Sequence, residues 1–232
     1  MLAENLIEWG QRCGVRNWVI ASAAEVYGSV DGAATEDSPT RPVIPYGEIK
    51  LRVERAFRVL ADNGARVVIL RIGEVYAPRG RLADELCGRL RGGFLPWPGH
   101  GQVPVSFVHV DDVAQAFLCA TRASDGGVSI YNVADDEPTT WRRFLEQLAA
   151  RLHSRKPVYL PLPLSRGYAA AARLGAALRR RETPVSPYLL RLLTTPKALS
   201  NRRIRDRLGF RPCFANCERG LEAMIDALSN HA

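Results

Sequence analysis

The stretch "ARVVILRIG", Ala65–Gly73, decides the fold. It is a continuous apolar run of the kind found in strands that are buried on both faces of a parallel sheet. Two further short apolar runs, "NWVIAS" (Asn17–Ser22) and "SIYNVA" (Ser129–Ala134), lie upstream and downstream of it, and amphipathic helical patterns separate the three. This alternation predicts an α/β fold with a doubly wound parallel sheet over residues 16–152.

The helices of this fold are predicted from 3.6-residue periodicity and from start and stop signals. They are expected at Ala3–Cys13, from Tyr46 to about Asn63, from about Arg81 to Leu90, from Asp111–Asp112, and after Thr139 or Thr140. The two aspartates would cap their helix, and His109 before them is expected to be a core histidine. Beyond residue 152 the pattern becomes mainly helical, so we predict two parts, residues 1–152 and a smaller lobe over residues 153–232.

The formal net charge of +8 is concentrated in the C-terminal part. Residues 1–150 hold 16 Lys and Arg against 19 Asp and Glu, whereas residues 151–232 hold 16 against 5. A basic segment can meet nucleic acid, an acidic membrane surface or an anionic substrate. The arginines follow helical patterns without interleaved aromatic residues, which favours a solvated helix face. We therefore expect no nucleic-acid partner.

Neither a leader nor a membrane span is predicted. The N-terminal "MLAENLIEWG" lacks a basic segment followed by a long apolar one, and the longest apolar runs are broken by arginine. Among the five cysteines, the pair in "CFANC" (Cys213–Cys217) has a spacing that, without nearby histidines, fits no usual zinc pattern. We expect reduced thiols, no bound metal and a cytoplasmic protein.

The stretch "PYGEIK", Pro45–Lys50, carries the candidate chemistry. Proline is favoured at the start of a helix, and Tyr46 and Lys50, four residues apart, share one face of its first turn. An ammonium beside a phenol lowers the tyrosine pKa from about 10 toward neutrality and makes it a usable general acid or base. Arginine outnumbers lysine 29 to 3, so a retained lysine points to a role for a compact ammonium. The alternative is an ordinary, partly exposed helix turn.

Four segments in order resemble the extended short-chain dehydrogenase/reductase family, also called NAD-dependent epimerase/dehydratases. They are "VIASAAEVYGS", "PYGEIK", "LRIGEVYAPRG" and "SFVHVDDVAQAF", followed by "YNVADDEPTTWRRF". The resemblance covers nearly the whole chain, and four ordered motifs are much more specific than any one of them. It implies a partial Rossmann-type sheet with a small, mainly helical substrate lobe, NAD or NADP as cofactor, and hydride transfer at a hydroxyl or carbonyl carbon of a small molecule.

The resemblance also assigns roles to residues. Tyr46 would be the catalytic acid and base, and Lys50 would bind the nicotinamide ribose while lowering the tyrosine pKa. The backbone from Ile72 through Gly73 to Val75 would face the nicotinamide.

The first departure from the family pattern is the missing glycine-rich turn. Neither G-x-x-G-x-x-G nor G-x-G-x-x-G occurs in the 232 residues, and those glycines let the backbone approach the cofactor pyrophosphate at a helix N-terminus. The chain resembles the family from about a third of the way along, as after a gene truncation, a late start or a split gene. We therefore expect weak cofactor binding and no NAD(P)-dependent turnover from this chain alone.

The second departure concerns the catalytic hydroxyl. The family's serine or threonine aligns on Ala23, which places this residue at the substrate but without a hydroxyl. Ser22 is adjacent, yet neighbouring strand side chains point to opposite faces, so Ser22 serves as the catalytic hydroxyl only if the strand end is irregular.

The third departure concerns the substrate. Val105 stands where sugar-nucleotide epimerases carry an arginine for the diphosphate, and Glu74, a candidate substrate contact, replaces the usual asparagine. Together with the tail "SNRRIRDRLGFRP", this resembles the hydroxysteroid- and dihydroflavonol-reductase-like branch, whose substrates are apolar alcohols or ketones. The alternatives are a sugar-nucleotide epimerase or dehydratase, and a non-catalytic remnant or binding module without cofactor affinity.

A sheet without the family's first strands would present an unpaired edge, which favours association. We therefore expect a homo-oligomer, or a separate chain that supplies the missing half.

Overall fold

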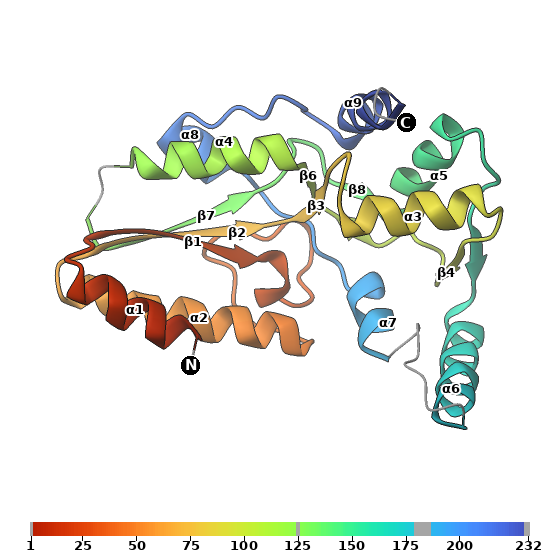
Figure 1. Ribbon diagram of the computed structural model, residues 1–232, viewed down its shortest axis with the longest axis horizontal. Coiled ribbons are helices and arrows are strands. Elements are labelled where there is room, and N and C mark those ends of the chain that lie inside the picture. Colours follow the sequence, from red (N-terminus) through yellow and green to blue (C-terminus); the bar gives the residue numbers. More distant parts are fainter. Residues whose placement is uncertain (1, 124–125, 179–186, 230–232) are drawn as a thin grey trace.

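The computed structural model describes residues 2–123, 126–178 and 187–229 (Figure 1). Its centre is a parallel sheet in the order β1-β2-β7, formed by β1 (Asn17–Ala23), β2 (Arg66–Ile72) and β7 (Val128–Val133). The register sets Ala23 beside Ile72 and Ile72 beside Val133, so the carboxyl ends of the three strands meet at one edge. The predicted parallel α/β architecture is confirmed.

Helices cover both faces of this sheet (Figure 1). On one face lie α1 (Leu2–Arg12) and α2 (Pro45–Asp62), and on the other lie α4 (Val110–Thr121) and α8 (Arg202–Leu208). Along the central strand, Val67 and Ile69 pack into the cluster shared with the first pair, whereas Val68 and Leu70 pack into the cluster shared with the second. Both faces of β2 are therefore buried, which explains its unbroken apolar sequence.

The remaining elements build the right-hand part of Figure 1. The strands are β3 (Glu74–Tyr76), β4 (Pro96–Pro98), β5 (Pro104–Val105), β6 (Phe107–His109), β8 (Thr139–Thr140) and β9 (Val158–Leu160); the helices are η1 (Ala24–Val26), a 3₁₀ turn at the end of β1, α3 (Arg81–Arg91), α5 (Trp141–Arg151), α6 (Leu162–Leu178), α7 (Pro187–Thr194) and α9 (Cys217–Ser229). One apolar cluster joins Phe107 and Trp141 to Leu221 of α9. The division at residue 152 stays a prediction.

The start of α4 differs in detail from the prediction. The helix begins at Val110, so His109 is its N-cap and its Nδ1 accepts from the backbone N–H of Asp111 at 3.3 Å. The Asp112 carboxylate is buried and accepts from the backbone N–H of Cys213 at 2.6 Å and of Phe214 at 3.3 Å. Asp112 therefore anchors the C-terminal segment, and the expectation that it caps its own helix is wrong.

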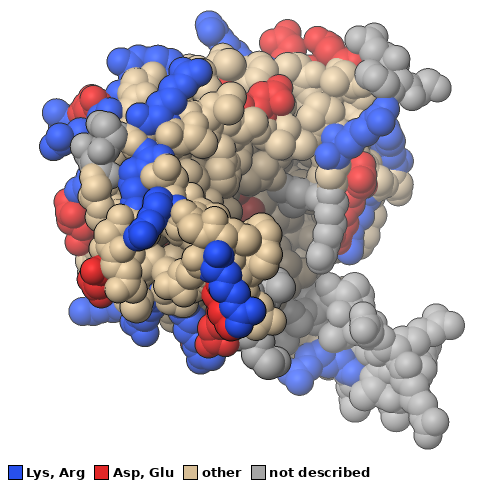
Figure 2. Space-filling model, turned by 60° about the vertical axis from the view of Figure 1, so that its left-hand side comes forward, with Lys and Arg blue, Asp and Glu red and all other residues tan. Residues whose placement is uncertain are grey.

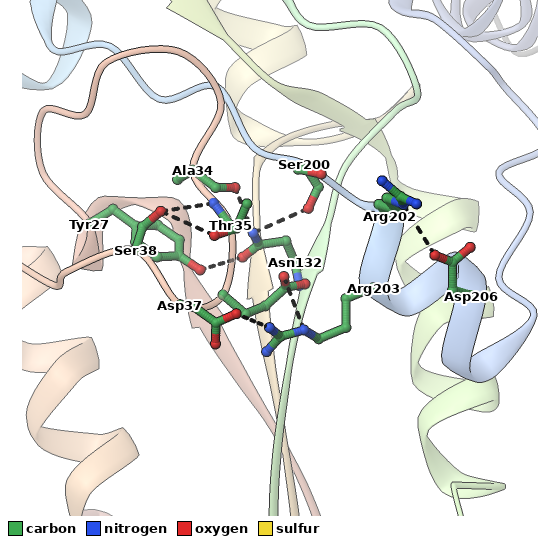
Figure 3. Close-up of polar contacts among 11 residues, drawn as sticks. Tyr27, Ala34, Thr35, Asp37, Ser38, Asn132, Ser200, Arg202, Arg203 and Asp206 are labelled. Atoms are coloured by element: carbon green, nitrogen blue, oxygen red, sulfur yellow. Dashed lines mark hydrogen bonds and ion pairs between the residues drawn. The ribbon is translucent and has the colours of Figure 1, made fainter.

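A polar network at the carboxyl end of the sheet joins segments that are distant in sequence. Figure 3 shows Asn132 of β7 between Tyr27, Ala34 and Ser200. Its Oδ1 accepts from the Tyr27 hydroxyl at 2.7 Å, and its Nδ2 donates to the carbonyls of Ala34 at 2.9 Å and Ser200 at 3.2 Å. The loop after β1 and the segment before α8 are thereby fixed to the sheet, next to the candidate site.

β1 forms an edge of the sheet, since within the described ranges no strand pairs with its other side. On the neighbouring helix α1, the Trp9 side chain is 62% exposed. Both features agree with the predicted tendency to associate, which stays a prediction. No helix in the described part of the chain is long and apolar enough to cross a membrane.

Candidate active site

Tyr46 lies in the first turn of α2, and a glycine brings that turn close to the end of β1. Pro45 opens the helix, and a Cβ on Gly47 would lie only 2.4 Å from the carbonyl oxygen of Glu25 in η1. Only glycine allows this approach. The predicted placement of Tyr46 at a helix N-terminus beside the carboxyl end of the first strand is thus what the structure shows.

Lys50 lies beside Tyr46, as their spacing predicts. Its Nζ is 5.6 Å from the centre of the Tyr46 ring and donates to the carbonyl oxygen of Ala21 in β1 at 3.2 Å. The Tyr46 side chain is 41% exposed. An ammonium has three donors, and this backbone contact uses one of them, so the pair is accessible and has hydrogen-bonding capacity left for a ligand.

The direction of the Tyr46 pKa differs from the prediction. Burial raises the pKa of the phenol, and the negative charges of Glu25 and Glu74, together with Tyr188 of α7, raise it further, while Lys197 lowers it. The expectation that Lys50 holds the pKa of Tyr46 below its ordinary value is therefore wrong for the chain on its own. The main reason is the burial of the phenol, to which the two carboxylates add.

These carboxylates belong to a group that we call the Lys197 cluster: Lys197, Glu25 and Glu74. The Lys197 side chain is buried, and its Nζ lies 3.0 Å from Glu25 Oε1 and forms a second ion pair with Glu74. Burial alone would lower the pKa of Lys197, but the two carboxylates outweigh it and the pKa is raised. Sequence reasoning missed Lys197, although the scarcity of lysine in the chain is a signal that could have found it.

The backbone around Lys197 is held as an extended segment. Its N–H donates to the carbonyl of Pro104 at 2.8 Å, and its carbonyl accepts from the N–H of Ser106 at 3.1 Å. Val105, between these two, is fully buried and forms a bridge with Lys197. The position at which the family resemblance places a diphosphate-binding arginine is thus an apolar strand contact that fixes Lys197.

Ser22 faces away from this site. β1 is regular through Ala23, so the two side chains point to opposite faces. The Ser22 hydroxyl is buried and donates to Glu54 Oε1 at 2.6 Å, and Glu54 also receives two hydrogen bonds from Arg71, at 2.9 and 2.7 Å. The irregular strand end that a catalytic Ser22 requires is absent, which argues against that role. Ala23 is buried at the strand end and brings no hydroxyl.

The backbone expected to face a nicotinamide lies at the same sheet edge, where most of its donors are used. The N–H of Gly73 donates to the carbonyl of Val133 at 3.0 Å, and that of Glu74 donates to the carbonyl of Ser106 at 2.9 Å. Ile72 ends β2 and is buried, whereas the Val75 side chain is exposed. Contacts of this stretch with a nicotinamide stay a prediction.

An apolar cavity of about 190 Å³ lies between α3, β4, α6 and α7. Its lining is mainly leucine, proline and aromatic side chains: Leu86, Leu95, Pro96, Trp97, Pro98, Leu160, Tyr168, Leu189, Leu190 and Leu193, with Glu85, Arg89 and Ser165. Helix α7 connects it to the site, because Tyr188 precedes two of these leucines and acts on the pKa of Tyr46. The cavity can therefore hold an apolar molecule against α7, the helix that carries Tyr188.

A buried acid elsewhere in the fold lacks a cation. Asp135 follows β7 and forms no ion pair within the described residues, and hydrogen bonding with Tyr76 and with the His109 backbone lowers its pKa only in part. Burial, with added repulsion from Asp112 and Asp136, raises the pKa of Asp135 to about 8.

Basic side chains are dispersed on the face shown in Figure 2, where acidic and uncharged groups interrupt them. The solvated helix face expected for the arginines of residues 151–232 stays a prediction.

With this geometry established, comparisons with known proteins place the chain. The model of the NAD dependent epimerase/dehydratase family matches residues 1–134. The chain belongs to this family. A 3-diazoavenalumate denitrifying reductase from Streptomyces sp is 29% identical over 225 residues, which cover 94% of this chain and 67% of that protein. The 3beta-hydroxysteroid-dehydrogenase/decarboxylase isoform 2 of Arabidopsis thaliana is 23% identical over 248 residues, or 98% of this chain and 44% of that protein.

Family members of known structure share the fold. MoeE5 in complex with UDP-glucuronic acid and NAD matches with a TM-score of 0.76 at 24% identity, over 99% of this chain and 70% of MoeE5. UDP-glucose 4-epimerase from Thermotoga maritima, with UDP-glucose, matches with a TM-score of 0.76 at 22% identity, over 99% of this chain and 68% of the epimerase. The chain thus spans between 44% and 70% of the length of these relatives.

Proposed function

We propose that this chain carries the tyrosine and lysine of an NAD(P)-dependent oxidoreductase or epimerase that acts on a hydroxyl or carbonyl carbon. The observation that carries the proposal is the accessible Tyr46–Lys50 pair at the carboxyl end of the sheet, with Lys50 fixed by the Ala21 carbonyl. In the reduction, the Tyr46 hydroxyl donates its proton to the substrate carbonyl oxygen as that oxygen gains negative charge. In the oxidation, Tyr46 accepts the proton of the substrate hydroxyl.

The bound nicotinamide would supply or accept the hydride. The residues present fit its riboside end: Lys50 has unused donors for ribose hydroxyls, and Val75 offers an exposed apolar contact. They do not fit the pyrophosphate, because the glycine-rich turn is absent from the sequence. We expect titration of the 232-residue chain with NADH or NADPH to show no saturation in the micromolar range.

For the substrate, we propose an apolar alcohol or ketone, as in the hydroxysteroid- and dihydroflavonol-reductase-like branch. The apolar cavity beside α7 supports this, since a largely apolar lining favours an apolar ligand body. Apolar Val105 in place of an arginine supports it as well. Among the relatives, a human sterol-4-alpha-carboxylate 3-dehydrogenase, decarboxylating, is 29% identical over 170 residues.

A sugar-nucleotide epimerase or dehydratase is the second candidate. It is favoured by a dTDP-glucose 4,6-dehydratase from Streptomyces griseus, which is 31% identical over 137 residues, or 56% of this chain and 41% of that enzyme.

The test is a chimera in which this chain follows the N-terminal part of the Streptomyces reductase that the match leaves uncovered. We expect NADH- or NADPH-linked reduction of a 3-ketosteroid and no conversion of UDP-glucose or dTDP-glucose. Tyr46→Phe should lower kcat by about 10²–10⁴-fold, which is the usual contribution of a general acid. The control is Tyr159→Phe, because Tyr159 stacks on Arg142 outside the site.

Turnover that is unaffected by Tyr46→Phe would contradict the proposal. Conversion of the sugar nucleotide alone would favour the second candidate, and a chimera that binds NADH without any turnover would favour a binding module.

A further inference from the structure

The Lys197 cluster lies beside the first turn of α2, where a Cβ on Gly47 would lie 2.4 Å from the Glu25 carbonyl oxygen, and it takes up no proton in the transfer described above. Its members come from three distant segments: Glu25 in η1, Glu74 at the start of β3, and Lys197 before α8. Both Tyr46 and Tyr188 have pKa values that respond to all three charges. These five side chains therefore form one electrostatically connected group, and the phenols of Tyr46 and Tyr188 are the members exposed on its outer side.

A purely structural cluster at this place would be costly. Removing three charges from water carries a desolvation penalty that ion pairing often fails to recover, and apolar side chains of similar size are frequently as stable. The cluster is also incompletely enclosed, because the side chains of Glu25 and Glu74 keep 10% and 20% of their accessible surface while that of Lys197 keeps 3%. The carboxylates thus form the accessible side of the cluster, with the ammonium behind them.

Two carboxylates and one ammonium leave the cluster with a net charge of −1. Each carboxylate has about four acceptor positions, and the contacts with Lys197 use one on each. The accessible side is therefore rich in acceptors and electrically negative. Lys50 forms no ion pair with the cluster within the described part of the chain, since its ammonium is bound to the Ala21 carbonyl.

We propose that the Lys197 cluster is the specificity-determining wall of the substrate site, which accepts an uncharged hydroxyl-bearing end of the substrate beside Tyr46 and rejects a carboxylate or phosphate there. Substrate hydroxyls donate to Glu25 and Glu74, and Lys197 holds both carboxylates in place. This inference rests on the proposed function and adds the chemical class of the substrate: an amphiphile with an apolar body and a neutral polar end.

The space at the cluster agrees with a small neutral group. A cavity of about 10 Å³ lies against Lys197 and Glu25, between Ile44 of the α2 entrance and Leu192 and Thr195 at the end of α7. That volume corresponds to about one water molecule. A phosphate does not fit such a space.

The test uses the 232-residue chain and two probes that share the same ring, cyclohexanol and cyclohexanecarboxylate, at pH 7. Binding is followed by the NMR signal of Tyr46 in protein labelled with [¹³Cζ]tyrosine, and Tyr46→Phe assigns that signal among the seven tyrosines. We expect cyclohexanol to shift the Tyr46 signal with at least tenfold higher affinity than the carboxylate.

The decisive variant is Glu25→Gln with Glu74→Gln, which keeps the shape and the acceptor oxygens but changes the charge of the cluster from −1 to +1. We expect the preference to reverse in favour of the carboxylate. The matched control is Glu8→Gln, which removes one charge on the surface of α1, where Glu8 pairs with Arg12. It should leave the preference unchanged. If the double variant does not fold, as judged by circular dichroism, Glu74→Gln alone should shift the preference in the same direction.

Equal binding of both probes by the unaltered chain would overturn the inference, as would the same preference in the double variant. The inference also fails if neither probe shifts the Tyr46 signal, because the cluster would then not face a binding site. None of these measurements depends on hydride transfer. An inactive chimera with the expected probe preference would refute the proposed function alone, and an active chimera without that preference would refute this inference alone.

Discussion

Two buried ion clusters lie near the carboxyl end of β1, and they are built in opposite ways. On the α2 face of the sheet, Glu54 receives hydrogen bonds from Arg71 and Ser22 and is completely buried, with Arg71 stacked 4.7 Å above the Tyr27 ring. In the Lys197 cluster the cation is buried and both carboxylates reach the surface. In the first cluster, hydrogen bonds occupy both carboxylate oxygens of Glu54. In the second, the carboxylates of Glu25 and Glu74 have acceptor positions left for a ligand.

The difference shows that a fully buried ion cluster stabilises the fold, whereas a partly exposed one has carboxylates left to contact a ligand. Burial raises the pKa of Glu54, but Arg71 and Ser22 outweigh it and the pKa is lowered, so this acid stays charged and paired inside the fold. It fixes α2 to β1 and β2 and thereby sets the position of Tyr46. The Lys197 cluster instead acts directly on the pKa of Tyr46.

The largest expected effect is that of Arg71→Met. It leaves the Glu54 charge buried without its main partner, and breaking a buried pair in this way typically costs about 3–5 kcal/mol. Urea denaturation followed by circular dichroism measures the loss in the free energy of unfolding. The control is Arg202→Met, which removes an exposed pair with Asp206 and should change stability by less than about 0.5 kcal/mol.

The second-largest effect is expected for Ser22→Ala, which tests whether Ser22 belongs to the buried cluster around Glu54. The variant loses a hydrogen bond to a charged acceptor, and such bonds contribute about 1.5–3 kcal/mol. Ser129→Ala on β7 is a control in the same sheet. A Ser22→Ala protein as stable as the unaltered chain would contradict the role given to Ser22 here.

Asp135 shows what happens to a buried acid without a cation. Its folded-state pKa of about 8 lies above the ordinary value for an unfolded chain, about 3.9. The folded protein thus holds this proton more tightly, so the contribution of Asp135 to stability is fully present below pH 4 and is lost as the pH rises through 8. Asp135→Asn should raise the free energy of unfolding at pH 9 by at least about 1 kcal/mol and leave it unchanged at pH 4. Equal effects at both pH values would contradict this.

The fold was predictable because its signals are local. The apolar run of β2, the proline and tyrosine that open α2 and the Thr140 cap of α5 each act within a few residues, and the structure confirms all three elements. The Tyr46–Lys50 pair could be predicted for the same reason, since helical spacing alone brings the two side chains together.

The rest of the site could not be predicted in this way, because it depends on contacts between distant segments. Nothing local in the sequence brings Lys197 to Glu25, 172 positions away. Burial, and then the charges of Glu25 and Glu74, reversed the predicted direction of the Tyr46 pKa, because the pairwise argument from Lys50 included none of them. Ser22 was misjudged because its partner Glu54 lies 32 residues away.

The most direct test of the difference between the two clusters is the pKa of Tyr46, measured by ¹³C NMR titration of the tyrosine-labelled chain. Lys197 lowers this pKa, so Lys197→Met should raise it, on the order of one pH unit for an opposite charge removed at close range. Lys197→Arg should keep it near its original value, and Ser22→Ala should not change it. A Tyr46 pKa that is the same in Lys197→Met as in the unaltered chain, or that moves as far in Ser22→Ala, would contradict the account.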